Sequence, residues 1–177
     1  MGHIETKVSG ELVYDGKIIK LYVDQAELEN GTIACREYIS HCGGAAILAE
    51  TEEGILFVEQ FRYPYGEVLL ELPAGKRDGD EDPAETAVRE LEEETGYFPQ
   101  KLMFLGEIYP SPGYTDEKIF LYFADGLEKR VQHTDDDEFL SVKAIKVEKV
   151  AEMIATGEIK DAKTIVAVLK YLGFYRR

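Results

Sequence analysis

The sequence contains little cysteine and no extended apolar run, and these absences exclude several classes of protein. Its two cysteines, Cys35 and Cys42, stand at a spacing that matches no zinc or redox motif. We therefore expect two free thiols, as is usual in a reducing compartment. The N-terminus lacks a basic segment followed by an apolar stretch, and no stretch is long enough to cross a bilayer. These features predict a cytoplasmic protein.

Positive charge is also scarce. The chain has 35 acidic residues against 20 basic ones, which gives a formal net charge of −15. Such a balance disfavours nucleic acid or an anionic membrane as the main partner. It is compatible with a site that collects divalent cations, although solubility is the simpler explanation of the charge taken alone.

The pattern along the chain indicates one mixed domain. No repeat, low-complexity segment or linker is visible, and 177 residues with 45% hydrophobic content are enough for one sizeable core. Short alternating or apolar runs predict strands, followed after a central helix by more strands and then by helices, which is typical of a mixed α/β sandwich. The expected strands span residues 11–28 (a hairpin turning at Asp15-Gly16), 32–40, 45–49, 55–60, 68–72, 101–109, 118–123 and 138–145, and the expected late helices span 147–155 and 162–172.

The central helix is predicted by its two ends. Asp82 is a suitable N-cap, and Pro83 is favoured in the first helical turn. Apolar residues follow at helical spacing up to Leu91, as one buried face requires. Gly96 then stands where a helix-terminating glycine is expected.

Three glutamates of this helix form a candidate metal site. Glu90, Glu93 and Glu94 stand at positions i, i+3 and i+4 and therefore share a helix face, which we expect at the edge of the apolar stripe. Like charges at this spacing destabilise a bare helix by roughly a few tenths of a kcal/mol, and a bound cation would reverse that effect. Carboxylate oxygens suit Mg²⁺, and Arg89 is placed to pair with Glu93. When the three glutamates are considered alone, a solvated acidic helix face explains them better than a metal site does.

The surrounding residues decide between these interpretations. Residues 75–97 hold a glycine, a glutamate, an Arg-Glu pair, a Glu-Glu pair and a closing Gly-aromatic pair in one register, namely Gly75, Glu81, Arg89-Glu90, Glu93-Glu94 and Gly96-Tyr97. This register resembles the Nudix box, Gly-x5-Glu-x7-Arg-Glu-U-x-Glu-Glu-x-Gly-U, where U is a bulky apolar residue. This resemblance implies an α/β/α sandwich with a mixed sheet, here preceded by N-terminal antiparallel strands. It also implies hydrolysis of nucleoside diphosphates linked to another moiety, with Mg²⁺ or Mn²⁺. Every defined position of the box is filled, by Gly75, Glu81, Arg89, Glu90, Leu91, Glu93, Glu94, Gly96 and Tyr97.

The resemblance also implies roles for individual residues. Glu90 and Glu94 correspond to the main metal ligands, together with the backbone carbonyl of Ala74, the residue before the box glycine. Glu93 corresponds to a further ligand or a water-orienting residue. Glu81 corresponds to the glutamate that supports the loop.

Residues outside the box resemble the ADP-ribose pyrophosphatase branch of the family. Pro112, downstream of the box, looks like the marker of this branch, and Glu117 matches a glutamate that contacts substrate. Upstream, Arg62 and Arg36 also resemble the branch, and a guanidinium at either position would suit a diphosphate. The resemblance therefore makes ADP-ribose, split to AMP and ribose 5-phosphate, the expected substrate.

Some roles and boundaries stay open at this stage. The general base of this branch is often a loop carboxylate, here within residues 135–138, where we favour Glu138 or Asp137, with Glu93 as an alternative. We expect residues 1–40 to form strands that belong to the same unit and mediate a homodimer, and residues 41–177 to form the Nudix hydrolase domain. Alternative functions are a diphosphatase for another nucleotide sugar, such as GDP-mannose, or for an oxidised nucleotide. A non-catalytic ADP-ribose sensor is a further alternative, which the complete box disfavours.

Overall fold

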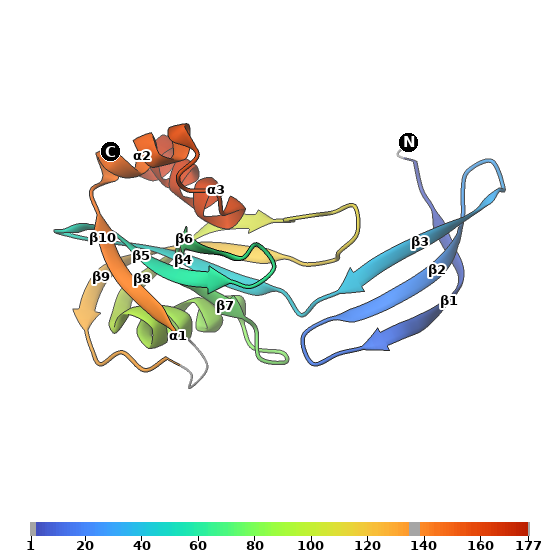
Figure 1. Cartoon of the computed structure of the whole chain (residues 1–177), viewed down its shortest axis with the longest axis horizontal. Coiled ribbons are helices and arrows are strands. Elements are labelled where there is room, and N and C mark those ends of the chain that lie inside the picture. The colour runs from blue at the N-terminus through green and yellow to red at the C-terminus, as the bar shows by residue number, and fades with distance from the viewer. Residues whose placement is uncertain (1–2, 135–138, 177) are drawn as a thin grey trace. The chain divides into compact units, whose positions relative to one another are not determined.

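The computed structural model describes residues 3–134 and 139–176 (Figure 1). The chain divides into two compact units, and we describe each by itself. The small unit consists of Met1–Cys42 and Tyr109–Glu117, and the large unit consists of Gly43–Ile108 and Lys118–Arg177. None of the helices within the described residues is both long and apolar enough to cross a membrane.

The small unit is built on a three-stranded antiparallel sheet. Its strands are β1 (Thr6–Asp15), β2 (Lys20–Glu27) and β3 (Ile33–Ser40), in the order β1-β2-β3. The expected turn after Asp15 is present, because the Gly16 N–H donates to the Ile19 carbonyl at 3.0 Å. All ten residues of β1 are exposed, including the apolar ones.

The large unit contains a mixed seven-stranded sheet. Its main path runs β10-β5-β4-β9-β8, in which β4 and β9 are parallel and all other pairs are antiparallel. β6 pairs with β5, and β7 pairs with β4. The mixed sheet expected from the sequence is therefore confirmed. The strands are β4 (Gly44–Thr51), β5 (Gly54–Arg62), β6 (Glu67–Glu71), β7 (Ala74–Lys76), β8 (Tyr97–Ile108), β9 (Ile119–Lys129) and β10 (Leu140–Ile145).

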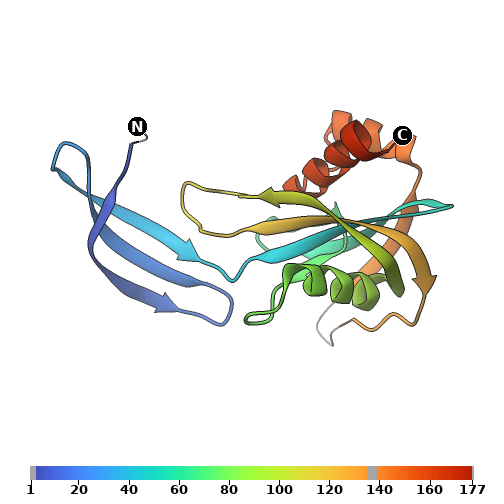
Figure 2. The ribbon, with the colours of Figure 1, turned by 180° about the vertical axis from the view of Figure 1, so that it is seen from behind.

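Helices cover both faces of this sheet, as Figures 1 and 2 show. α1 (Pro83–Thr95) lies on one face, and α2 (Val147–Thr156) and α3 (Ala162–Lys170) lie on the other. The side chains of β4 alternate between two cores: Ile47 packs in the cluster with α1, and Leu48 packs in the cluster with α2 and α3. Burial on both faces explains why the sequence of this strand is continuously apolar. The α/β/α sandwich is confirmed.

Several elements differ from the sequence-based expectation, and β9, for example, runs to Lys129 rather than to residue 123. β8 begins directly after Gly96, whose left-handed conformation (φ 70°) turns the chain so that Tyr97 already pairs with Lys129. The short strand β7 was not expected at all. The last helix ends at Lys170, and residues Tyr171–Tyr175 form a π-helix closed by a bond from the Arg176 N–H to the Tyr171 carbonyl.

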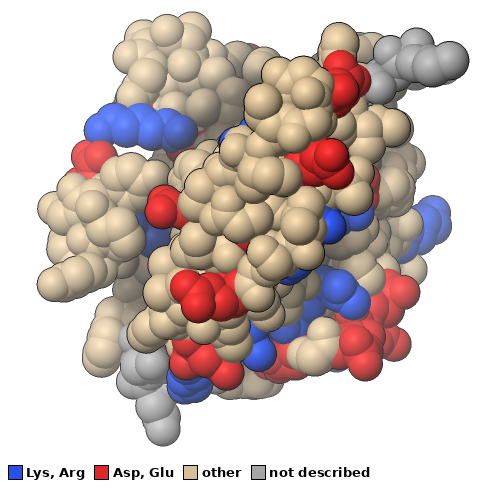
Figure 3. All heavy atoms as spheres, turned by 90° about the vertical axis from the view of Figure 1, so that its right-hand side faces the viewer, with Lys and Arg blue, Asp and Glu red and all other residues tan. Residues whose placement is uncertain are grey.

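The negative net charge does not produce a uniformly acidic surface. On the face shown in Figure 3, lysine and arginine side chains lie beside aspartate and glutamate side chains. This face therefore presents charges of both signs.

Candidate active site

The ends of α1 fix the register of its glutamates. Asp82 accepts a hydrogen bond from the Ala84 N–H at 2.8 Å, and Pro83 is the first helical residue. At the other end, Gly96 adopts the left-handed conformation and its N–H donates to the Glu92 carbonyl at 2.9 Å. Both ends are those predicted from the sequence.

Glu90 and Glu94 lie on the buried face of α1. They are 7% and 2% exposed, beside Leu91, which is fully buried. We expected the carboxylates at the edge of the apolar stripe, and the structure shows that these two are buried. Buried carboxylates require polar partners. Glu94 accepts a hydrogen bond from the Ala74 N–H at 3.0 Å, and Glu90 accepts one from Arg89 at 2.8 Å.

The backbone at Gly75 closely approaches the Glu90 carboxylate. A Cβ atom added at Gly75 would lie 2.0 Å from Oε1 of Glu90 and 2.5 Å from Oε2. Real Cβ atoms do not occur at such distances, so only glycine allows this approach. The absence of a side chain at this position therefore brings the carboxylate against the backbone of β7.

Arg89 ties the loop before α1 to the helix. Its guanidinium donates to both carboxylate oxygens of Glu81, at 3.1 and 3.0 Å, and to Glu90 and Glu93 at 2.8 and 2.9 Å. The hydrogen bonds from Arg89, assisted by the Thr86 hydroxyl, lower the pKa of Glu81 to about 2. The bonds to Glu81 in turn raise the pKa of Arg89. The expected Arg89–Glu93 pair is present, and the Glu93 side chain remains 35% exposed.

The donor set of this region fits a hard divalent cation. It offers two carboxylates, Glu90 and Glu94, next to the backbone of Ala74 and Gly75. Within the part of the chain that the structure describes, no group of three or more His, Cys, Asp or Glu side chains is arranged to hold an ion. Mg²⁺ is commonly held by one or two carboxylates, with water and substrate phosphates as its remaining ligands. Two carboxylates are therefore a sufficient side-chain contribution.

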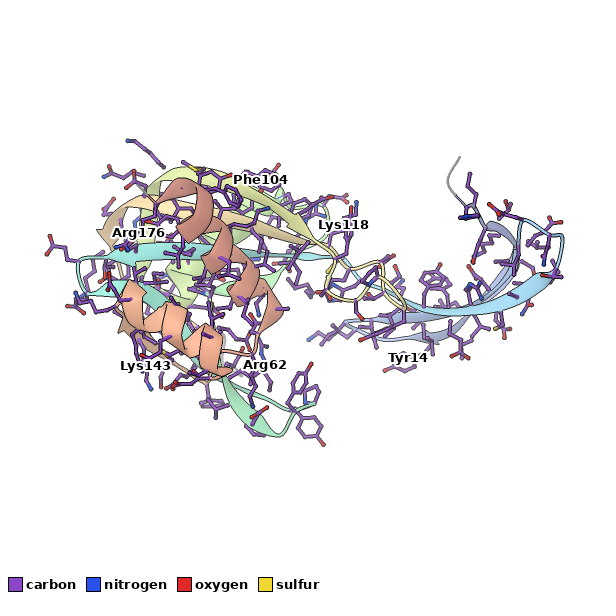
Figure 4. All side chains as sticks on the ribbon, turned by 90° about the horizontal axis from the view of Figure 1, so that it is seen from above. Tyr14, Arg62, Phe104, Lys118, Lys143 and Arg176 are labelled. Atoms are coloured by element: carbon purple, nitrogen blue, oxygen red, sulfur yellow. The ribbon has the colours of Figure 1, made fainter. Side chains whose placement is uncertain are left out.

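A second charged group joins the last residue of β5 to the last residue of β6. Arg62, labelled in Figure 4, donates from Nε and Nη2 to the two carboxylate oxygens of Glu71 at 2.6 and 2.8 Å. Glu71 is 2% exposed and also forms an ion pair with Lys163. Burial alone would raise the pKa of Glu71, but the bonds from Arg62 and the charge of Lys163 outweigh burial and lower this pKa to about 2.

The residues between Glu71 and Ala74 are held one by one. The buried Leu72 N–H donates to the Thr164 hydroxyl at 2.8 Å, and the Pro73 carbonyl accepts from the Ile47 N–H at 2.9 Å. Ala74 is then held by Glu94, as described above. The first turn of α3 thus helps to fix the backbone that leads to Gly75.

A hollow of about 700 Å³ lies along the outer side of α1. It is bordered by Glu93 and Arg89, and neither Glu90 nor Glu94 lines it. Its apolar lining comes from Ala84, Val88 and Leu102.

Comparison with known proteins assigns this arrangement to a family. The family model of the NUDIX domain matches residues 41–168, which are most of the chain. The chain belongs to the NUDIX domain family. An "ADP-ribose pyrophosphatase" of Bacillus subtilis is 42% identical over 169 residues, covering 93% of this chain and 90% of the relative. A "Methanol dehydrogenase activator" of Bacillus methanolicus is 41% identical over 167 residues, with the same coverage of 93% and 90%.

A solved structure supports the fold independently. The crystal structure of an "ADP compounds hydrolase" matches with a TM-score of 0.85 and 19% identity, covering 96% of this chain and 93% of that one. At this identity the match establishes the fold alone. Together with the family and its enzyme relatives, it identifies the chain as a Nudix hydrolase.

The predicted Nudix site residues are divided between the two units. Glu90, Glu93, Glu94 and Ala74 all lie at α1 and β7 in the large unit. Arg36 and Glu117 belong to the small unit, where they are found in local pairs: Arg36 donates to Glu5 at 2.8 and 2.6 Å, and Glu117 lies 3.6 Å from His41. The favoured bases, Asp137 and Glu138, lie outside the described residues.

Three residues near the site were not found by sequence reasoning. They are Glu71, Lys163 and Thr164. Lys163 contacts Glu71, and Thr164 accepts from the Leu72 N–H, each across 92 positions of sequence. The available signals were an acidic residue within the predicted apolar strand 68–72, and a Lys-Thr pair in the first turn of the predicted helix 162–172. Neither pattern predicts which distant residue it contacts, because the contact exists only in the folded chain.

Proposed function

We propose that this Nudix hydrolase is a divalent-cation-dependent pyrophosphohydrolase of nucleoside diphosphate sugars and splits ADP-ribose to AMP and ribose 5-phosphate. The observation that carries the proposal is the buried pair Glu90 and Glu94 beside the backbone at Gly75. The choice of ADP-ribose is supported by the Bacillus subtilis relative named for this activity.

In this proposal, Glu90, Glu94 and the Ala74 carbonyl hold Mg²⁺ or Mn²⁺. When bound, the cation neutralises charge on the phosphoryl oxygens and activates the attacking water. Arg62 orients a phosphate of the substrate, since the fork of a guanidinium matches phosphate oxygens. Glu93 is a candidate to orient the water or to accept its proton, because its side chain is partly exposed next to the buried pair.

The remaining site assignments extend the proposal beyond α1. Arg36 would bind the diphosphate, and Glu117 would contact the substrate. Glu138 or Asp137 would be the favoured general base, with Glu93 as the alternative. We further propose that the sheet of the small unit mediates a homodimer. Its exposed apolar side chains support this, with Val8, Leu12 and Val13 between 43% and 57% exposed. Sedimentation of a monomer at all accessible concentrations would contradict the dimer.

The first test is product analysis with purified protein. ADP-ribose, GDP-mannose, other nucleoside diphosphate sugars and an oxidised nucleotide are incubated with and without Mg²⁺. We expect AMP and ribose 5-phosphate to form only with the cation and fastest from ADP-ribose. Glu94→Gln should lower turnover by at least about 100-fold, because cation stabilisation is worth several kcal/mol. Glu92→Gln is the matched control, since Glu92 lies on the same helix but pairs with Arg130 at 3.1 Å.

Each other outcome changes a different part of the proposal. Faster cation-dependent cleavage of another nucleotide sugar keeps the class and replaces the substrate. Turnover of Glu94→Gln within a few-fold of wild type removes Glu94 from the cation site. Binding of ADP-ribose without cleavage would favour the sensor function instead.

A further inference from the structure

A neutral group of four charged residues lies next to the candidate site. Arg62 and Lys163 are its cations, and Glu71 and Asp161 are its anions. Lys163 contacts Glu71 and lies 3.0 Å from Asp161, and its side chain is only 12% exposed. Such a largely covered lysine differs from the exposed Lys160 nearby, which pairs with Glu67 at the surface.

Arg62 uses only part of its hydrogen-bonding capacity on Glu71. Nε and Nη2 donate to the carboxylate, whereas Nη1 has no partner within residues 3–134 and 139–176. The Glu94 carboxylate acts on Arg62 electrostatically, which relates the guanidinium to the cation site. One edge of the Arg62 fork is therefore available to an anion.

The second cation on Glu71 explains how Arg62 could serve that anion. If Arg62 were the only partner of Glu71, any shift of its guanidinium toward a phosphate would leave a buried carboxylate uncompensated, and an unpaired buried charge is costly. Lys163 remains paired with the Glu71 carboxylate when the Arg62 guanidinium moves. It therefore lowers the cost of moving or sharing the guanidinium.

We propose that Lys163 is a positioning residue, which neutralises Glu71 so that Arg62 is free to bind a phosphate of the substrate. This inference rests on the proposed function, because it assumes a diphosphate at the site. Lys163 itself does not touch the substrate in this scheme. It acts on KM through Arg62.

The test compares four variants in steady-state kinetics with ADP-ribose at saturating Mg²⁺. Lys163→Met should raise KM about tenfold or more, because charge-assisted hydrogen bonds contribute on this scale, while kcat changes less. Lys163→Arg should restore a KM near that of wild type. Lys160→Met, the matched surface control, should leave both constants unchanged. In a Glu71→Gln background, adding Lys163→Met should not change KM further, since no buried charge needs neutralising.

A structural role for Lys163 would give a different result. In that case Lys163→Met would have a lower melting temperature and an unchanged KM. The loss of thermal stability would persist in the Glu71→Gln background. A KM of Lys163→Met within twofold of wild type overturns the inference while the proposed function stands. If the wild-type chain cleaves no nucleotide, the proposed function fails. The role of Lys163 is then tested separately, by calorimetry of inorganic pyrophosphate binding to wild type and to Lys163→Met in the presence of Mg²⁺. Tenfold weaker binding to Lys163→Met supports the inference, and equal binding, or no binding to wild type, overturns it.

Discussion

Replacement of Gly75 by alanine should disable the cation site without disturbing the backbone. The φ angle of Gly75 is not in the left-handed region, so alanine is compatible with the local conformation. The obstacle is the Glu90 carboxylate, whose Oε1 would lie 2.0 Å from the new methyl group. An ordinary contact requires at least 3.4 Å, so the carboxylate must retreat by more than an ångström. Metal ligands tolerate displacements of about 0.2 Å, and a 1 Å misplacement typically costs about 100-fold in rate.

The assay is turnover of ADP-ribose as a function of Mg²⁺ concentration, with thermal unfolding measured in parallel. We expect Gly75→Ala to lose about 100-fold in turnover or to need much more Mg²⁺, while remaining folded. Gly173→Ala is the control, because a Cβ at Gly173 meets nothing within 4 Å. Turnover and Mg²⁺ dependence like those of wild type would refute the placement of Glu90 at the cation.

Two further predictions concern the residues that support this backbone. The pKa of Glu71 is about 2 in the folded chain against an ordinary value of 4.5. The ionised Glu71 therefore adds roughly 3 kcal/mol to the free energy of unfolding above pH 4.5, and this contribution is lost as the pH falls toward 2. In urea unfolding, the stability advantage of wild type over Glu71→Gln should shrink across this window, and a constant difference would contradict the assignment. Thr164→Val should lower the free energy of unfolding by about 1–3 kcal/mol, because it leaves the buried Leu72 N–H without an acceptor, whereas Thr164→Ser should cost much less.

Local signals in the sequence were sufficient for most of the fold. The turn at Gly16, the cap at Asp82 and the terminating Gly96 depend on the chemistry of one or two neighbouring residues, and each was predicted correctly. The apolar run 45–49 was likewise predicted as a strand, and the structure buries its side chains on both faces of the sheet. β7 escaped prediction because three residues, Ala-Gly-Lys, carry no period and are extended only through pairing with β4.

The candidate site was predictable in its ligands but not in its supports. The helical pattern placed Glu90 and Glu94 at the edge of the apolar stripe, but it did not predict that both carboxylates would be buried. Their burial depends on Ala74 and Arg89, which supply the hydrogen bonds that compensate the loss of water. The Glu71–Lys163 pair joins positions 92 residues apart, and neither residue indicates the other in the sequence.

The small unit has a consequence for any attempt to shorten this chain. Residues 109–117 lie between β8 and β9 in the sequence, yet they belong to the small unit. Ile39 exchanges backbone hydrogen bonds with Tyr114 and Asp116 at 2.8 and 3.1 Å, and the Asp116 carboxylate accepts from the His41 N–H at 2.8 Å. Deleting the first 42 residues would therefore remove the hydrogen-bond partners of the internal loop 109–117 and make this loop more susceptible to proteolysis. An expression fragment that begins at Gly43 would need a shortened β8–β9 connection as well.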